Sequence, residues 1–144
     1  MKSWIYLFDH EDLSSVVDMV ETTGTSYIPS IDSGEVGDTV FIGSGEYGGR
    51  ILYMTTVTDI RGYVADDGEV FFDTIAERGM LIVDELRFAS LQKEGLPELK
   101  EGEAVHLAAA FAEKLKACFA TLDDYGNDEA IDLKQRIISD ARTE

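Results

Sequence analysis

The residue types that could carry catalysis are few in this chain. It has one cysteine, Cys118, and two histidines, His10 and His106. Cys118 falls on the apolar stripe of a predicted helix, where a thiol behaves as a small inert hydrophobe, and His106 falls on the polar side of that helix. His10 follows the first predicted strand among acidic residues, where it could act as a general base or contact a nucleobase. The spacings typical of zinc ligands do not occur. We therefore predict a protein without enzymatic activity, metal or cofactor.

One glycine-rich motif has the spacing of a dinucleotide-binding loop. The string Gly43-Ser-Gly45-Glu-Tyr-Gly48 matches G-x-G-x-x-G, which holds a pyrophosphate only where a helix N-terminus follows. Here the β-branched run Arg50–Asp59 follows instead, and the repeated βαβ units of a dinucleotide-binding sheet are missing. The motif therefore predicts a hairpin loop.

Aromatic residues gather in the first third of the chain. They are Trp4, Tyr6, Phe8, Tyr27, Phe41, Tyr47 and Tyr53. Core packing explains most of them. Tyr27 and Tyr47 fall in predicted loops, where an aromatic side chain can line a pocket or stack on a flat ligand.

The charge of the chain is strongly negative. Twelve Lys and Arg against 29 Asp and Glu give a net charge of −17. Nucleic-acid binding draws most of its affinity from cations on phosphates, so this composition argues against a generic nucleic-acid binder. It fits a very soluble acidic protein, a mimic of nucleic acid, or a protein of a high-salt cytoplasm. A polar run at Asp9–Asp12 stands where a signal peptide would stay apolar, and no apolar stretch could span a membrane, so we expect a cytoplasmic protein.

The hydrophobic pattern predicts the elements that must position these residues. Strands are predicted at Ser3–Phe8, Thr39–Ile42, Arg50–Asp59 and Gly79–Ala89, and helices at Glu11–Thr22, Glu69–Arg78, Glu103–Leu122 and Asn127–Arg142. For Glu69–Arg78, half of a hairpin is the alternative. Tyr27–Glu35 is predicted as a loop, and Ser90–Gly95 as a single helical turn capped by Ser90. A chain of 144 residues with this order of elements predicts one compact α+β fold around a strongly bent sheet.

Two neighbouring stretches resemble the EVE domain, a member of the PUA-like superfamily. Val36–Ile42 is similar to its Gly-Asp strand, and Gly49–Val57 to its Arg-Ile-x-Tyr strand, with a Gly-rich loop between them. Trp4–Phe8 resembles its first strand, and Leu81–Leu96 resembles the late strand and turn of versions found in modification-dependent restriction proteins. The resemblance implies an α+β, PUA-like pseudo-barrel of about five to six strands with flanking helices. It covers residues 1–122 as one domain, with 123–144 as an acidic C-terminal extension that is predicted to be helical.

The function that this resemblance implies is recognition rather than catalysis. PUA-like modules of this kind accept a base, often a modified one, that has been swung out of a nucleic acid. The positions that match such a pocket are Trp4, Phe8, His10, Tyr27, Ser44 and Tyr53, with Arg50 for phosphate or base-edge contacts. The implied partners are a modified nucleic acid or nucleotide, in a restriction, defence or RNA-modification system, and a protein partner for the C-terminal extension.

A second function stays open on the same fold. The stretch Pro97–Glu103 is acidic where relatives of the EVE domain are often rich in Gly, Pro and Arg. An acidic protein-interaction module, acting as a nucleic-acid mimic or an inhibitor, is therefore the alternative. The arrangement of charge discriminates the two: Arg50, Arg61, Arg87 and Lys93 gathered around aromatic residues would favour base recognition, and acids there would favour mimicry.

Overall fold

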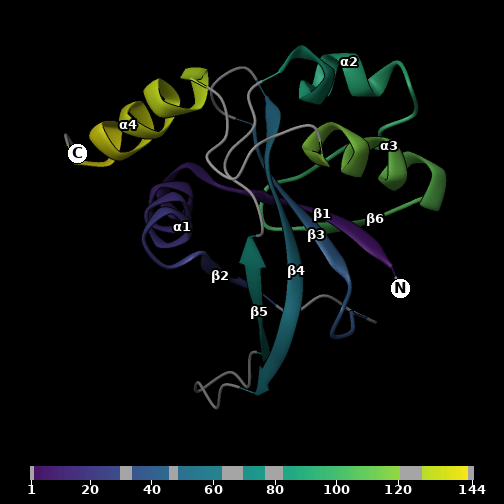
Figure 1. Ribbon diagram of the computed structural model, residues 1–144, viewed down its shortest axis with the longest axis horizontal. Helices are drawn as coiled ribbons and strands as arrows, with labels where there is room; N and C mark the ends of the chain where they lie inside the picture. Colours follow the sequence, from purple (N-terminus) through teal and green to yellow (C-terminus); the bar gives the residue numbers. More distant parts are fainter. Residues whose placement is uncertain are drawn as a thin grey trace.

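The architecture is one mixed sheet with helices on both faces (Figure 1). The computed structural model describes residues 2–29, 34–45, 49–62, 70–76, 83–120 and 128–142. The six strands follow the order β2-β5-β4-β3-β1-β6 across the sheet. Their bounds are β1 Ser3–Phe8, β2 Thr25–Pro29, β3 Thr39–Ser44, β4 Arg50–Gly62, β5 Val70–Ala76 and β6 Ala104–Leu107. The described pairing of β1 with β3 is parallel, and the other described pairings are antiparallel. The predicted α+β class is confirmed.

Strand β1 has apolar side chains on both faces because it lies inside the sheet, between β3 and β6. Trp4, Tyr6 and Phe8 pack in one hydrophobic cluster, whereas Ile5 packs in a second cluster on the opposite face. The predicted strand Ser3–Phe8 is confirmed.

Helix α1, His10–Thr23, is bounded by caps that the sequence carries. The carboxylate of Asp9 accepts a hydrogen bond of 2.8 Å from the amide of Asp12, which satisfies one free N–H of the first turn. At the other end Gly24 adopts φ 75°, in the left-handed region that favours glycine, and its amide donates to the carbonyl of Val20. The predicted helix Glu11–Thr22 is confirmed.

The helices bury two separate hydrophobic clusters against the sheet. Helix α1 and the C-terminal helix α4, Asp128–Arg142, share the cluster of Trp4 and Phe8, and Ala130 and Ile137 of α4 are buried in it. Helices α2, Phe88–Gln92, and α3, Ala109–Ala120, lie on the other side (Figure 1). The predicted helix at the C-terminus is confirmed, whereas the proposed boundary between residues 122 and 123 falls outside the described residues.

Two segments form strands where the sequence predicts other structures. The predicted loop Tyr27–Glu35 is wrong at its start, because Tyr27 belongs to β2, which ends at Pro29; residues 30–33 lie outside the described part. The predicted helix Glu69–Arg78 is also wrong over 70–76, which is β5 and pairs with β2 and β4. The alternating residues Phe72 and Thr74 point into the core, a period of two that suits a strand paired on both sides.

The predicted helix Glu103–Leu122 is wrong in its first part. Ala104–Leu107 is strand β6, antiparallel to β1, and helix α3 begins only at Ala109. The edge of β1 offers backbone N–H and C=O groups that need partners, and β6 supplies them. Leu107 still packs in the same hydrophobic cluster as Leu115 and Phe119 of α3. The apolar stripe of the predicted helix therefore reaches one interior, although Leu107 belongs to a strand.

The predicted strand Gly79–Ala89 is wrong over its described part. Asp84–Leu86 forms the 3₁₀ turn η1, and α2 follows at once with Arg87, rather than Ser90, at its N-cap position. This helical path carries both Leu86 and Leu91 into the same cluster. Residues 77–82 lie outside the described ranges.

Candidate functional site

Four of the seven predicted site residues come together at one end of the sheet. In the parallel register of β1 and β3, Phe8 lies opposite Ser44, and in the antiparallel register of β3 and β4, Ser44 lies opposite Arg50. His10, the first residue of α1, follows Phe8 after one residue. We call Phe8, Ser44 and Arg50 the sheet-end row. Cross-strand partners project from the same face of a sheet, which here is the α1 face, because Phe8 packs in the α1 cluster.

The sheet-end row combines an aromatic ring, a hydroxyl and a guanidinium. Phe8 and Ser44 are buried, and Arg50 is half-buried at the start of β4. The ring of Phe8 stands edge-on to that of Tyr6, with 4.7 Å between the centroids. A hydroxyl can donate one hydrogen bond and accept two, and a guanidinium donates in a planar fork. Such a set can recognise a flat ligand that has acceptor atoms on its edge.

Arg87 extends the row by one position and was absent from the predicted site residues. It lies opposite Arg50 in an isolated antiparallel bridge. Arg87 was among the four cations whose gathering would favour base recognition, and the structure brings two of them together. Lys93 lies at the far end of α2, and Arg61 lies near the opposite end of β4.

Trp4 has a structural partner away from this row. Its indole Nε1 donates a hydrogen bond of 3.1 Å to Asp38, whose carboxylate is 1% exposed. The same carboxylate accepts hydrogen bonds of 3.0 Å from the amides of Lys2 and Glu35. Burial alone would raise the pKa of Asp38, but these hydrogen bonds outweigh it and hold the pKa below its ordinary value. The hydrogen bonds of the Asp38 carboxylate therefore hold the start of β1 against the start of β3.

Tyr53 and Tyr27 also lie apart from the row. Tyr53 is fully buried, and its hydroxyl donates a hydrogen bond of 2.9 Å to Glu21, which also forms an ion pair of 3.2 Å with Lys134 of α4. Burial, followed by the charge of Glu21, raises the pKa of the Tyr53 phenol. Tyr27 is 46% exposed on the edge strand β2, opposite Asp73. Tyr47 lies outside the described residues.

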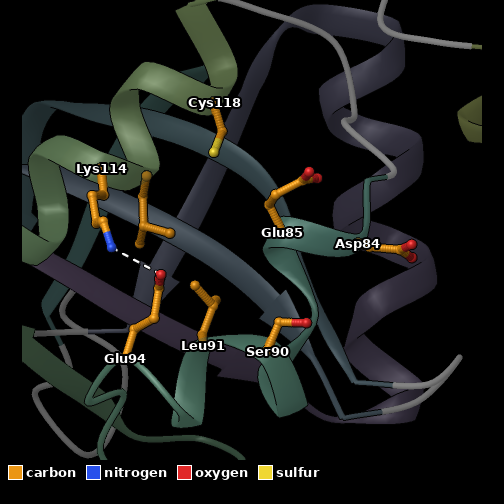
Figure 2. A pocket seen from close by; sticks show the side chains of 8 residues that line it. Asp84, Glu85, Ser90, Leu91, Glu94, Lys114 and Cys118 are labelled. Carbon is orange, nitrogen blue, oxygen red and sulfur yellow. Dashed lines mark hydrogen bonds and ion pairs between the residues drawn. The ribbon is translucent and has the colours of Figure 1, made fainter.

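A separate cavity of about 380 Å³ opens between η1, α2 and α3 (Figure 2). Leu91 and Leu115 line it together with polar residues: Asp84, Glu85, Ser90, Glu94, Lys114 and Cys118. Lys114 donates to Glu94 across 2.8 Å, as the dashed line in Figure 2 shows. Burial, then the charges of Glu85 and Glu94, raise the pKa of the Cys118 thiol. A thiol held protonated in this way is a poor nucleophile.

Neither a metal site nor a membrane helix is found in the part of the chain that the structure describes. Its histidines, cysteine and carboxylates form no group of three or more that could hold a metal ion. No helix among these residues is long and apolar enough to cross a membrane.

Comparison with known proteins identifies the fold. In sequence, no protein-family model and no curated protein matches the chain. In structure, an ASCH protein from Zymomonas mobilis superimposes with a TM-score of 0.53 at 6% identity, over 88% of this chain and 99% of that one. The fold is PUA-like.

Two further solved structures agree with this fold. A hypothetical protein from Leishmania major gives a TM-score of 0.59 at 11% identity, over 84% of this chain and 96% of that one. A protein from Rhodopseudomonas palustris gives 0.55 at 10% identity, over 85% and 96%. The predicted PUA-like pseudo-barrel is thus confirmed as a fold. At these low identities the comparison shows the fold alone, and no site residue is assigned to this chain from the similar structures.

Proposed function

We propose that the protein is a non-catalytic, cytoplasmic module that binds a nucleobase at the sheet-end row. The observation that carries this proposal is the register alignment of Phe8, Ser44 and Arg50 beside His10. Phe8, Ser44 and Arg50 come from different parts of the sequence, and the registers of the sheet bring them onto one face. A base bound there gains ring contact and hydrogen bonds to its edge without a positive surface around it.

The finer identity of the ligand belongs to the same proposal. The EVE-like motifs of β3 and β4 favour a modified base, carried by a nucleic acid or a nucleotide, in a restriction, defence or RNA-modification system. The net charge of −17 fits such a function only if binding depends on the contacts of the sheet-end row and not on the overall charge, because the chain as a whole repels phosphates.

The test is a nuclear magnetic resonance titration with methylated and unmethylated nucleosides and short oligonucleotides. We expect backbone amide shifts confined to residues 8–10, 44–45 and 50. Arg50→Gln should weaken binding about 10-fold or more, because a charge-assisted hydrogen bond contributes about 1.5–3 kcal/mol. Lys100→Gln is the matched control, since it removes one exposed cation outside the row. No shift with any base-containing probe would refute the proposal.

A second candidate function is supported by the cavity of Figure 2. Glu85, Glu94 and Asp84 line this cavity together with Leu91 and Leu115, so the cavity suits the alkyl stem and charged head of a partner's arginine or lysine. On this reading the protein is an acidic protein-interaction module.

The same titration separates the two functions. With a tetra-arginine peptide, shifts at residues 84–94 and 114–118 would favour protein interaction, if Glu85→Gln with Glu94→Gln weakened binding more than the charge-matched pair Asp18→Asn with Asp132→Asn. Equal losses in both pairs would mean general attraction by the acidic chain and would exclude this function for the cavity.

A further inference from the structure

The bridge between Arg50 and Arg87 places two arginines at directly opposite backbone positions. Besides the register match, the amide of Phe88 donates a hydrogen bond of 3.0 Å to the carbonyl of Gly49. Directly opposite residues of an antiparallel pair have Cβ atoms about 4.5–5.5 Å apart and project from the same face. Arg87 therefore extends the sheet-end row on the side of Ser44 and Phe8.

The position of Arg87 is fixed by packing rather than by its own charge. The ring of Phe88 lies so close to the base of the β3–β4 hairpin that a Cβ atom on Gly43 or Gly49 would come within 3.0 or 3.1 Å of it. Gly49 also adopts φ 68°, in the left-handed region. This close contact holds residues 87 and 88 across the hairpin, and Arg87 therefore lies opposite Arg50.

Like charges at directly opposite positions are unfavourable unless another group neutralises them. Asp84 forms an ion pair of 3.2 Å with Arg87, but the two side chains are 87% and 51% exposed, so water screens the pair strongly. A ligand anion can compete with such an exposed carboxylate. A phosphate has the charge and the acceptor oxygens to receive hydrogen bonds from two guanidinium groups at once.

We propose that Arg50 and Arg87 together bind a phosphate group, so that the ligand of the sheet-end row is a nucleotide, free or within a chain, rather than a base or nucleoside. This inference rests on the proposed function, because it assigns the phosphate of the ligand whose base the row holds. Asp84 occupies Arg87 until the phosphate displaces it.

The test compares affinities by calorimetry at one fixed ionic strength. The probes are a nucleoside, its 5′- and 3′-monophosphates, a tetranucleotide of the same base and inorganic phosphate. We expect a monophosphate to bind about 10- to 100-fold tighter than the nucleoside, which is the range of a charge-assisted hydrogen bond. Equal affinity of the tetranucleotide and the monophosphate would indicate a free nucleotide, and a tighter tetranucleotide would indicate a chain; both support the phosphate contact.

The variants make the assignment specific. Arg87→Gln should remove most of the advantage of the monophosphate over the nucleoside, and circular dichroism checks that the variant is folded. Lys93→Gln removes the same charge at the far end of α2 and should change neither affinity. Asp84→Asn should strengthen monophosphate binding, because it removes the carboxylate that competes with the phosphate at Arg87, whereas Asp18→Asn on α1 should not.

The outcomes separate this inference from the function on which it rests. Equal affinities of nucleoside and monophosphate, or equal losses of both in Arg87→Gln, would overturn the phosphate contact and leave base binding intact. Binding of inorganic phosphate that depends on Arg87, without binding of the nucleoside, would support the phosphate contact and refute base recognition. Absence of binding by every probe would overturn both.

Discussion

Replacing Asp38 should destabilise the protein more than replacing any exposed acid. Its buried carboxylate accepts three hydrogen bonds, from the amides of Lys2 and Glu35 and from the indole of Trp4. Asp38→Ala leaves these three donors without an acceptor in a site that is 1% exposed. Each hydrogen bond to a charged group contributes about 1.5–3 kcal/mol, so three set an upper bound of about 9 kcal/mol.

The expected loss is smaller than this bound. Removing one partner of a buried charged network costs about 3–5 kcal/mol, because the remaining groups relax and water reaches them. We expect this loss in the free energy of unfolding for Asp38→Ala, measured by urea titration with circular dichroism as the signal. Asp38→Asn keeps the volume and one acceptor oxygen, and should lose about 2–3 kcal/mol. Asp18→Asn, on the exposed side of α1, should stay within about 0.5 kcal/mol.

The pH dependence provides an independent check. The pKa of Asp38 is lowered in the folded protein, so its contribution is fully present above the unfolded value of about 3.9 and is lost as the pH falls through the folded pKa. The stability difference between the parent and Asp38→Asn should therefore shrink below about pH 4. A loss under about 1 kcal/mol for Asp38→Ala at neutral pH, or a difference independent of pH down to about pH 2, would refute the role of this carboxylate.

Three further predictions concern packing around the row and the edges of the fold. Gly49→Ala should cost about 1–3 kcal/mol in urea unfolding, because of its positive φ and the ring of Phe88, whereas Gly45→Ala, with open space around it, should cost less than about 1 kcal/mol. Ile137→Ala should cost about 2–5 kcal/mol in the same assay, because Ile137 is buried against the sheet; a smaller loss would mean that α4 is not part of the core. Tyr27→Ala should leave the stability nearly unchanged and the affinity for a nucleoside within about twofold of the parent, since Tyr27 is half-exposed and lies away from the row. A large loss of affinity without a loss of stability would show that the site lies at β2.

The sequence predicted those elements whose patterns agree with their tertiary surroundings. The continuous apolar run of Ser3–Phe8 identified β1, which is buried on both faces. The spacing of Leu13, Val16 and Val20 identified α1, whose apolar face packs in one cluster. The prediction failed for 104–107, whose strand form depends on β1 far along the chain. For 70–76 the hairpin alternative was right, because this strand pairs with the preceding β4 as well as with the distant β2. A local pattern cannot report a neighbour that lies about 50 or 100 residues away.

The candidate site shows the same limit. Phe8, His10, Ser44 and Arg50 were selected together, and the registers of β1, β3 and β4 explain why they meet. Trp4 and Tyr53 were selected for their ring chemistry, but hydrogen bonds with Asp38 and Glu21 give them a role in the interior. Arg87 could not be placed beside Arg50 from sequence, because a single bridge and the packing of Phe88 decide its position.

The pairing of β1 with β6 has a consequence for synthesis of the chain on the ribosome. Ser3 lies opposite Leu107, and 107 − 3 = 104 residues separate them. At about 5–20 residues per second, translation takes about 5–20 s to deliver the second partner after the first. Throughout that interval the nascent chain carries an apolar segment, Trp4–Phe8, with one edge uncovered. Molecular chaperones that hold extended apolar segments therefore have time to bind this one, and the last strand to emerge must displace them before the sheet can close.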